Sequence, residues 1–165
     1  MTSKTYKISL CGIGGVGKSA ITKRFKYNTY DEEYIPTTAD SYERKLNVNG
    51  TDCFLEILDT AGQEDHESLK DPYIRNSEGF ILVYAVDDKE SLDRLNSIYE
   101  QIKRIKCPTD NTIQPPICIA ANKSDKEEFR FLLSEDGRKM AENFDTKFME
   151  CSAKNDNNIN QVVYF

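Results

Sequence analysis

The stretch Gly12-Ile13-Gly14-Gly15-Val16-Gly17-Lys18-Ser19 decides the fold of this chain. It consists of a glycine, four further residues and Gly-Lys-Ser, and it follows an apolar run over residues 6–11 that alternates as a strand does. Backbone N–H groups must turn inward to contact phosphate oxygens, and glycine permits this because it adopts positive φ and has no Cβ. The pattern therefore predicts a strand, a phosphate-binding loop and then a helix beginning near Lys18, with its positive end facing the anion.

Two side chains of this stretch have expected roles toward a bound nucleotide. Lys18 would reach the β- and γ-phosphates as a point charge, and the Ser19 hydroxyl would coordinate a Mg²⁺ ion that bridges them. A glycine-rich turn without a ligand is the alternative, and the strand pattern that precedes the loop argues against it. The loop indicates a nucleoside triphosphate, but it identifies neither the base nor the fate of the γ-phosphate.

The composition limits the class of protein. With 165 residues the chain fits one domain, and its net charge of −6 argues against nucleic acid as the main partner, because neutralising phosphates needs a basic face. The chain has no run of eighteen apolar residues and no apolar signal region at its N-terminus, so we expect a protein that is cytoplasmic or on a cytosolic surface. Five cysteines without a C-x-x-C pair favour buried free thiols over a disulfide or zinc site: Cys11, Cys53, Cys107, Cys118 and Cys151.

Strand-like and helical segments alternate along the rest of the chain. Asn49-Gly50 joins strand-like runs at residues 43–48 and 52–58, which predicts an antiparallel hairpin. After it come expected strands at 79–86, 117–121 and 147–151, and expected helices at 89–106, 134–144 and from 158 onward. This order favours a doubly wound α/β sheet with its ligand at the carboxyl ends of the strands. The residues expected at that rim, each at the end of a separate strand, are Gly12, Asp59, Asn122 and Ser152.

A second motif on this rim is Asp59-Thr60-Ala61-Gly62-Gln63-Glu64. A carboxylate at a strand end suits Mg²⁺, held directly or through water, so Asp59 is a candidate. The Gly62 amide would then meet the γ-phosphate. Gln63 can orient a water molecule without carrying charge, which suits a loose transition state that needs positioning more than proton abstraction.

The motif that bears on the base is Asn122-Lys123-Ser124-Asp125. The Asp125 carboxylate can accept two parallel N–H bonds, and guanine offers N1–H and the 2-amino group side by side, whereas adenine offers no such pair. Adenine would leave Asp125 unpaired at a cost of ~1–3 kcal/mol or more. In Cys151-Ser152-Ala153-Lys154, a backbone N–H would donate to the guanine O6. The two motifs together favour a guanine nucleotide, GTP or GDP.

In their order along the chain, these motifs resemble the small GTPases of the Ras family over nearly the whole sequence. The resemblance rests on Gly-x-x-x-x-Gly-Lys-Ser, the loop from Tyr34 to Tyr42, Asp-Thr-Ala-Gly-Gln-Glu, Asn-Lys-x-Asp and Ser-Ala-Lys, at close to the family's spacing. It implies one GTPase domain over residues 1–165, with its last helix cut short at Phe165. It also implies an α/β fold of the P-loop NTPase type, in which a six-stranded, mostly parallel sheet has one antiparallel edge strand and helices on both faces.

The resemblance also implies a role for each matching residue. The residues implied in catalysis are Gln63, Gly14, Lys18 and Thr37. The implied metal ligands are Ser19 and Thr37, with Asp59 acting through water. The implied nucleotide-binding residues are Gly14, Gly15, Val16, Gly17, Lys18, Ser19, Ala20, Tyr30, Thr37, Gly62, Asn122, Lys123, Asp125, Ser152, Ala153 and Lys154.

The implied function is a monomeric molecular switch in signal transduction, active with GTP and inactive with GDP. As an enzyme it would hydrolyse GTP to GDP and phosphate, slowly alone and faster with a GTPase-activating protein. A guanine nucleotide exchange factor and an effector, bound through switch I from Tyr34 to Tyr42, complete the implied partners. Attachment to the inner face of a membrane would come only through a lipidated C-terminal tail beyond Phe165.

The sequence leaves the subfamily and two rival functions open. Thr37-Thr38-Ala39-Asp40-Ser41-Tyr42 is closer to Ral than to Ras or Rap, so the effector is not identified. A small P-loop kinase would share residues 12–19, but it needs an arginine-rich lid over its acceptor and would leave Asp125 unexplained. A scaffold that holds GTP permanently is disfavoured by Gln63 and Gly14, because such proteins have usually lost one or the other.

Overall fold

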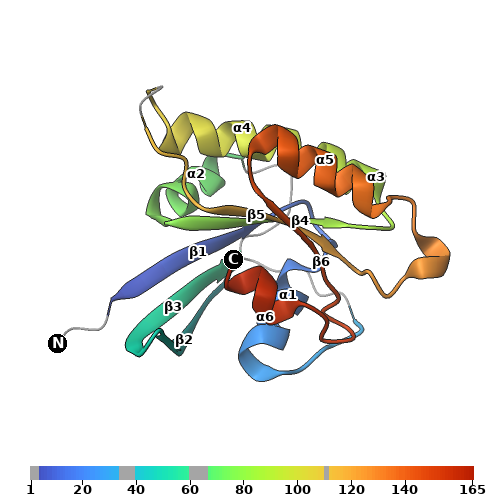
Figure 1. The fold of residues 1–165 in the computed structure, drawn as a ribbon, viewed down its shortest axis with the longest axis horizontal. Coiled ribbons are helices and arrows are strands. Elements are labelled where there is room, and N and C mark those ends of the chain that lie inside the picture. Colours follow the sequence, from blue (N-terminus) through green and yellow to red (C-terminus); the bar gives the residue numbers. More distant parts are fainter. Residues whose placement is uncertain (1–3, 34–39, 60–66, 110–111) are drawn as a thin grey trace.

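Within the residues that the structure describes, six strands form a single sheet in the order β2-β3-β1-β4-β5-β6 (Figure 1). The computed structural model describes residues 4–33, 40–59, 67–109 and 112–165. All neighbouring strands are parallel except β2 and β3, which form an antiparallel pair at one edge. The predicted fold class is thereby confirmed. The strands are β1 (Thr5–Cys11), β2 (Asp40–Val48), β3 (Thr51–Asp59), β4 (Gly79–Ala85), β5 (Ile117–Asn122) and β6 (Lys147–Glu150).

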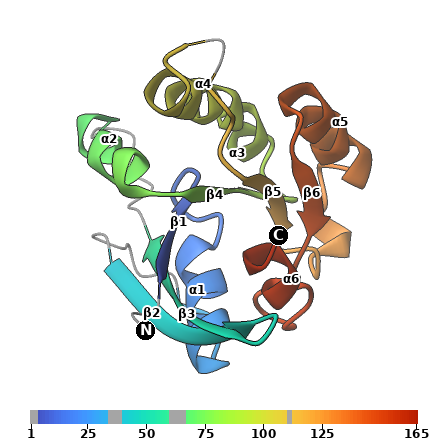
Figure 2. The same cartoon turned by 60° about the vertical axis from the view of Figure 1, so that its left-hand side comes forward.

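Helices cover both faces of the sheet (Figure 1, Figure 2). One face carries α2 (Glu67–Asn76), α3 (Lys89–Asp93), α4 (Leu95–Lys106) and α5 (Ser134–Phe144), and the other carries α1 (Lys18–Tyr27) and α6 (Ile159–Val163). A short 3₁₀ helix, η2 (Glu127–Phe129), precedes α5. Across the described ranges, none of the helices is both long and apolar enough to span a membrane.

Strand β4 is buried along its whole length. Its side chains alternate between the two apolar clusters: Phe80, Leu82 and Tyr84 belong to the cluster under α2–α5, and Ile81, Val83 and Ala85 belong to the cluster under α1 and α6. A strand with parallel neighbours and helices on both faces has no solvent side. This is why the run at 79–86 is apolar without alternation, as the sequence indicated.

The hairpin between β2 and β3 turns at Asn49 and Gly50, which have φ of 51° and 82°. Positive φ at both central residues defines the tight turn whose twist matches the flanking strands. The Asn47 side chain closes this turn, since its Oδ1 accepts from the Gly50 N–H at 3.1 Å and its Nδ2 donates to Asp52 at 2.7 Å. The predicted antiparallel hairpin is confirmed, and β2 begins three residues earlier than expected, at Asp40.

The helix expected at 89–106 is instead two helices, α3 and α4, which meet at Arg94. Polar side chains at the junction compete for backbone carbonyls: Asn96 Nδ2 donates to Asp93 O at 3.1 Å, and Ser97 Oγ donates to Arg94 O at 2.9 Å. Side chains of this kind weaken regular helical bonding where they bind the backbone. The apolar stripe nevertheless faces the core as predicted, with Leu92, Leu95 and Ile102 buried.

All five cysteines are free thiols, as the sequence indicated. Four are buried, and Cys107, which follows α4, is half-buried. Burial raises the pKa of the Cys118 thiol to about 12, because a thiolate there would lose its hydration. Burial likewise raises the pKa of Cys151.

Helix α5 lies against the sheet at Gly137. A Cβ at this position would collide with the Phe148 ring of β6 and with the Tyr84 hydroxyl of β4. Tyr84 is fully buried, and burial raises the pKa of its hydroxyl. The missing side chain therefore sets how closely this helix can approach the sheet.

We expect Gly137→Ala to lower the free energy of unfolding by about 1–2 kcal/mol. The added methyl overpacks the contact with Tyr84 and Phe148, and this cost exceeds the ~1 kcal/mol gain in helix propensity. Urea unfolding at pH 7 measures the change. Asn143→Ala, at an exposed position of the same helix, is the control and should shift stability by less than about 0.5 kcal/mol. Equal effects of the two substitutions would contradict the packing role of Gly137.

Candidate nucleotide-binding site

The loop between β1 and α1, residues 12–17, curls back over the carboxyl ends of β4 and β5. Gly15 and Gly17 have φ of 83° and 97°, a region that favours glycine. A Cβ on Gly12 would collide with the Val83 carbonyl of β4, and a Cβ on Gly17 would collide with the Asn122 side-chain amide. Glycine is therefore required at 12 and 17 by contacts with neighbouring strands. We call residues 12–19 the phosphate loop.

Lys18 is the first residue of α1 and is only 6% exposed. Its ammonium group donates to the carbonyls of Gly12 and Ile13, at 2.9 Å each, so the side chain reaches back across the loop. Gly14 is exposed at the tip of this loop, whereas Val16 is buried beneath it. Positive charge from Lys18 and from the N-terminus of α1 thus converges on the backbone of this loop.

The second residue of α1, Ser19, lies beside Asp59 at the end of β3. Ser19 Oγ donates to Asp59 Oδ2 at 2.5 Å, and Asp59 is fully buried. A hydroxyl and a carboxylate are the oxygen ligands that Mg²⁺ prefers, so the pair fits such an ion. Within the described part of the chain, no group of three or more His, Cys, Asp or Glu side chains could hold a metal by itself. The remaining ligands would have to come from elsewhere, as in sites completed by phosphate oxygens and water.

Asn122, at the end of β5, joins the phosphate loop to the segment after β6. Its Nδ2 donates to Val16 O at 2.9 Å, and its Oδ1 accepts from the Ala153 N–H at 3.2 Å. The side chain is 2% exposed. We call residues 151–154 the base loop. The sequence motifs centred on residues 16, 122 and 153 therefore meet through one amide group.

The base loop is tied to Asp125 and folded on itself. Ser152 Oγ donates to Asp125 Oδ1 at 2.6 Å and accepts from the Asn155 N–H at 3.0 Å. The backbone of Ser152 pairs with that of Asn157 in both directions, at 3.0 and 2.9 Å. Asp125 Oδ1 is thus oriented by a hydroxyl from the loop that is expected to lie against the same base.

Asp87, two residues beyond β4, was not anticipated from the sequence. Its Oδ2 accepts from Lys126 Nζ at 2.7 Å, and its Oδ1 lies 4.0 Å from Lys123 Nζ. Burial raises the pKa of Asp87, but the hydrogen bond from Lys126 and the charges of both lysines outweigh it and lower the pKa overall. Burial lowers the pKa of Lys123. The signal that could have pointed to Asp87 is its place, because it is a carboxylate that closely follows a parallel strand on the same rim.

Of the other predicted site residues, some lie in the part of the chain that the structure describes and some lie outside it. Ala20 is half-buried in α1, and Tyr30 is half-buried against the apolar cluster under α1 and α6. In the switch I range, Ser41 and Tyr42 are in β2, where Ser41 Oγ donates to Glu56 at 2.7 Å. The predictions for Thr37, Gly62 and Gln63 fall outside the described residues.

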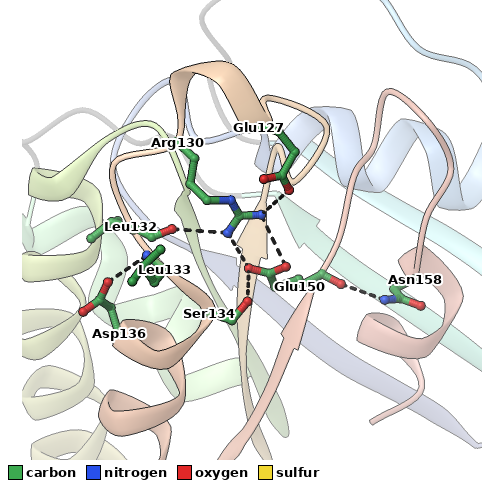
Figure 3. A network of polar contacts seen from close by, with 8 residues as sticks. All are labelled: Glu127, Arg130, Leu132, Leu133, Ser134, Asp136, Glu150 and Asn158. Atoms are coloured by element: carbon green, nitrogen blue, oxygen red, sulfur yellow. Dashed lines mark hydrogen bonds and ion pairs between the residues drawn. The ribbon is translucent and has the colours of Figure 1, made fainter.

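An ion-pair network supports the start of the base loop (Figure 3). Arg130, whose side chain is 11% exposed, donates to Glu150 at 2.6 and 3.4 Å, and Ser134 Oγ donates to the same carboxylate at 2.7 Å. Asn158 Nδ2 donates to the Glu150 carbonyl at 2.9 Å. Because Cys151 follows Glu150 directly, this network holds one end of the base loop to α5 and to the segment after η2.

Residues 7–165 match the family model described as Ras family. The chain belongs to the Ras family. The Ral-B protein of Rattus norvegicus is 41% identical over 159 residues, which cover 96% of this chain and 76% of the relative. The Ras-like protein rasB of Dictyostelium discoideum is 41% identical over 162 residues, covering 98% of this chain and 80% of the relative. The O-RAL protein of Diplobatis ommata is 40% identical over 159 residues, which cover 96% of this chain and 76% of the relative.

As a Ras-family small GTPase, the protein binds guanine nucleotide, hydrolyses GTP and acts as a signalling switch. Proteins of this family work with regulators and effectors. The phosphate loop and the Asn122 to Asp125 motif indicated the guanine nucleotide from the sequence, and the resemblance to the Ras family implied the hydrolysis and the switch.

We expect Glu150→Gln to lower the free energy of unfolding by about 1–3 kcal/mol at pH 7, since it leaves the largely buried Arg130 with only the exposed carboxylate of Glu127 as an anionic partner. Burial raises the pKa of Glu150, but hydrogen bonds from Arg130 and Ser134 outweigh it and hold the pKa below its ordinary value. A carboxylate with a depressed pKa stabilises the fold above its ordinary pKa of about 4.3 and loses that contribution as the pH falls through its folded-state pKa. The difference between native protein and variant should therefore shrink in acid.

Urea unfolding at a series of pH values from 7 to 3 tests this expectation. The matched control is Glu127→Gln, because Glu127 also binds Arg130, at 3.0 Å, but its side chain is 72% exposed. Its removal should have a small effect at every pH. A Glu150→Gln penalty that stays constant down to pH 3 would show that the Arg130 pair is not its source.

Proposed function

We propose that GTP and GDP lie along this rim, with the phosphates in the phosphate loop and the guanine between Asp125 and the base loop. The observation that carries the proposal is the double engagement of Asn122, which bonds Val16 on the phosphate side and Ala153 on the base side. Two half-sites fixed to one buried amide keep a constant spacing, as a ligand with a phosphate end and a base end requires.

At the phosphate end, the proposed ligands are backbone N–H groups of residues 14–20 and the ammonium of Lys18. Lys18 would exchange its carbonyl partners for the β- and γ-phosphates, which are stronger acceptors because they are charged. The N-terminus of α1 adds its partial positive charge to the same position. These groups bind and orient the phosphates and do not themselves react.

The metal-ligand assignment is also a proposal. Ser19 and Thr37 would ligate Mg²⁺ directly, and Asp59 would do so through water. Its support is the adjacent pair of oxygen side chains, Ser19 and Asp59. When bound, the ion would supply positive charge that offsets the negative charge developing on the phosphate oxygens.

At the base end, Asp125 would accept the N1–H and 2-amino hydrogens of guanine, and the base loop would donate a backbone N–H to O6. Lys123 would lie along the base with its aliphatic stem, and Tyr30 would pack on the guanine from the α1 side. Supporting this assignment, the Asp125 carboxylate is already oriented by the Ser152 hydroxyl.

Hydrolysis would depend on Gln63, which orients the attacking water, and on space above the γ-phosphate next to Gly14. Thr37 and Gly62 would contact the γ-phosphate, so that the segments around them order with GTP and are released after hydrolysis.

The proposed partners are a GTPase-activating protein that supplies an arginine, a guanine nucleotide exchange factor, and an effector bound through residues 34–42. We propose a monomer that reaches a membrane only through a lipidated C-terminal tail.

Replacing Asp125 by Asn tests the base assignment. The amide can donate to the carbonyl that xanthine has in place of the guanine 2-amino group, so preference should move from GTP toward xanthosine triphosphate. The expected loss is about 1–3 kcal/mol of GTP binding free energy, or about 5- to 150-fold in GTP affinity. Dissociation constants for both nucleotides measure it. An unchanged preference for GTP would rule Asp125 out as the residue that recognises the base.

Replacing Gly14 by Val tests the catalytic assignment. The side chain would project into the space that Gln63 and an arginine from the activating protein share, while the loop N–H groups stay in place. Stimulated hydrolysis should fall by most of the ~10³–10⁵-fold acceleration that such an arginine supplies. GTP affinity and melting temperature should stay near those of the native protein, and single-turnover assays with and without the activating protein give the rates.

The comparison variant is Gly15→Ala. Nothing lies within 4 Å of a Cβ added there, but φ of 83° strains any side chain, so stability and nucleotide affinity should fall together. If Gly14→Val behaves in the same way and hydrolyses GTP at the native rate, Gly14 is only a turn glycine and the catalytic assignment fails.

A further inference from the structure

Arg24, in the last turn of α1, binds the base loop across the molecule. Its Nε donates to Ala153 O at 2.8 Å, and its Nη2 donates to Lys154 O at 2.9 Å. Its Nη1 donates to Asn28 O at 3.1 Å, at the residue that ends the helix. One half-buried guanidinium therefore connects the carboxyl end of α1 to two successive peptide groups of the loop.

The geometry of a trans peptide gives this contact a consequence for the opposite edge of the loop. Within one planar peptide group the carbonyl and the following N–H point in opposite directions. Holding Ala153 O toward Arg24 therefore aims the Lys154 N–H away from Arg24. A cation at the carbonyl also polarises the peptide and makes that N–H a better donor.

Two N–H groups that precede the Lys154 N–H in the base loop have protein partners. The Ser152 N–H donates to Asn157 O at 3.0 Å, and the Ala153 N–H donates to Asn122 Oδ1 at 3.2 Å. The Ala153–Lys154 peptide is thus the part of the loop whose orientation Arg24 fixes, and its N–H is directed outward from that contact.

We infer that Arg24 is a positioning residue for guanine recognition, holding the Ala153–Lys154 peptide so that its N–H meets the guanine O6. This rests on the proposed placement of the base. Arg24 does not touch the nucleotide itself. Through α1, Arg24 connects the base loop to the helix whose first residues, Lys18 and Ser19, face the phosphates. Lys18 lies six residues before Arg24, roughly 9 Å away along the helix axis.

Loss of the hydrogen bonds from Arg24 should let the base loop move and so speed nucleotide release. Two hydrogen bonds from a charged donor hold the loop, and removing them should raise the GDP dissociation rate about tenfold in Arg24→Ala. Arg24→Gln, which keeps one amide donor, should lie between the native protein and Arg24→Ala. The rates come from chasing ribose-labelled N-methylanthraniloyl-GDP with excess GDP.

Arg44 supplies a matched control. Its Nη1 donates to Phe25 O at 2.6 Å and its guanidinium lies 4.6 Å from the centroid of the Phe25 ring, so it also binds the last turn of α1. Both of these contacts are with Phe25, and neither involves the base loop. Arg44→Ala should therefore lower the melting temperature but change GDP release less than about twofold.

A second probe separates positioning from a general loosening of the fold. 6-Thio-GDP keeps the N1–H and 2-amino groups that Asp125 is proposed to bind, but its sulfur is a weaker acceptor than O6. The native protein should release labelled 6-thio-GDP faster than labelled GDP. In Arg24→Ala the ratio of the two rates should fall toward one, because the donor that distinguishes them is no longer held.

The outcomes separate this inference from the proposal on which it rests. If the native protein releases the two nucleotides at the same rate, no loop donor recognises O6, and both the base placement and the role of Arg24 are overturned. If the native protein discriminates and Arg24→Ala discriminates equally well, only the role of Arg24 is overturned. Equal acceleration of GDP release in Arg24→Ala and Arg44→Ala would also overturn it, since Arg24 would then act only through the stability of α1.

Discussion

The arrangement of the site depends on the buried amide of Asn122. An amide can donate and accept at once, and here Nδ2 binds the Val16 carbonyl while Oδ1 binds the Ala153 N–H. A carboxylate would place a negative oxygen against Val16 O, and an aliphatic side chain would leave both buried backbone groups without partners. The same amide occupies the space where a Cβ of Gly17 would lie, so the glycine and the asparagine constrain each other.

Features set by local chemistry were predictable from the sequence. Asn49-Gly50 specified the hairpin because both residues adopt positive φ, and the all-apolar run at 79–86 specified a strand covered on both faces. The rim followed from topology alone, because the carboxyl ends of parallel strands lie at one edge of a sheet. Gly12, Asp59, Asn122 and Ser152 could thus be assigned to one region before any contact among them was known.

Contacts that long side chains make with residues far away in the sequence were not predictable. Arg24 and Ala153 are 129 positions apart, and Lys126 and Asp87 are 39 apart. A flexible arginine or lysine selects its partner from whatever the folded backbone brings within reach, and a sequence pattern carries no record of that choice. The break between α3 and α4 was not predictable either, because the apolar stripe continues through it and the Ser97 hydroxyl selects the Arg94 carbonyl only in the folded chain.

The distribution of thiols has a practical consequence for labelling. Four sulfurs are buried, and the raised pKa values of Cys118 and Cys151 keep those two in the thiol form, which reacts slowly with electrophiles. Cys107 is the half-buried one, and it lies between α4 and the amino end of β5, at the opposite end of that strand from Asn122. A maleimide dye should therefore attach there first, which gives the native sequence a reporter position remote from the nucleotide.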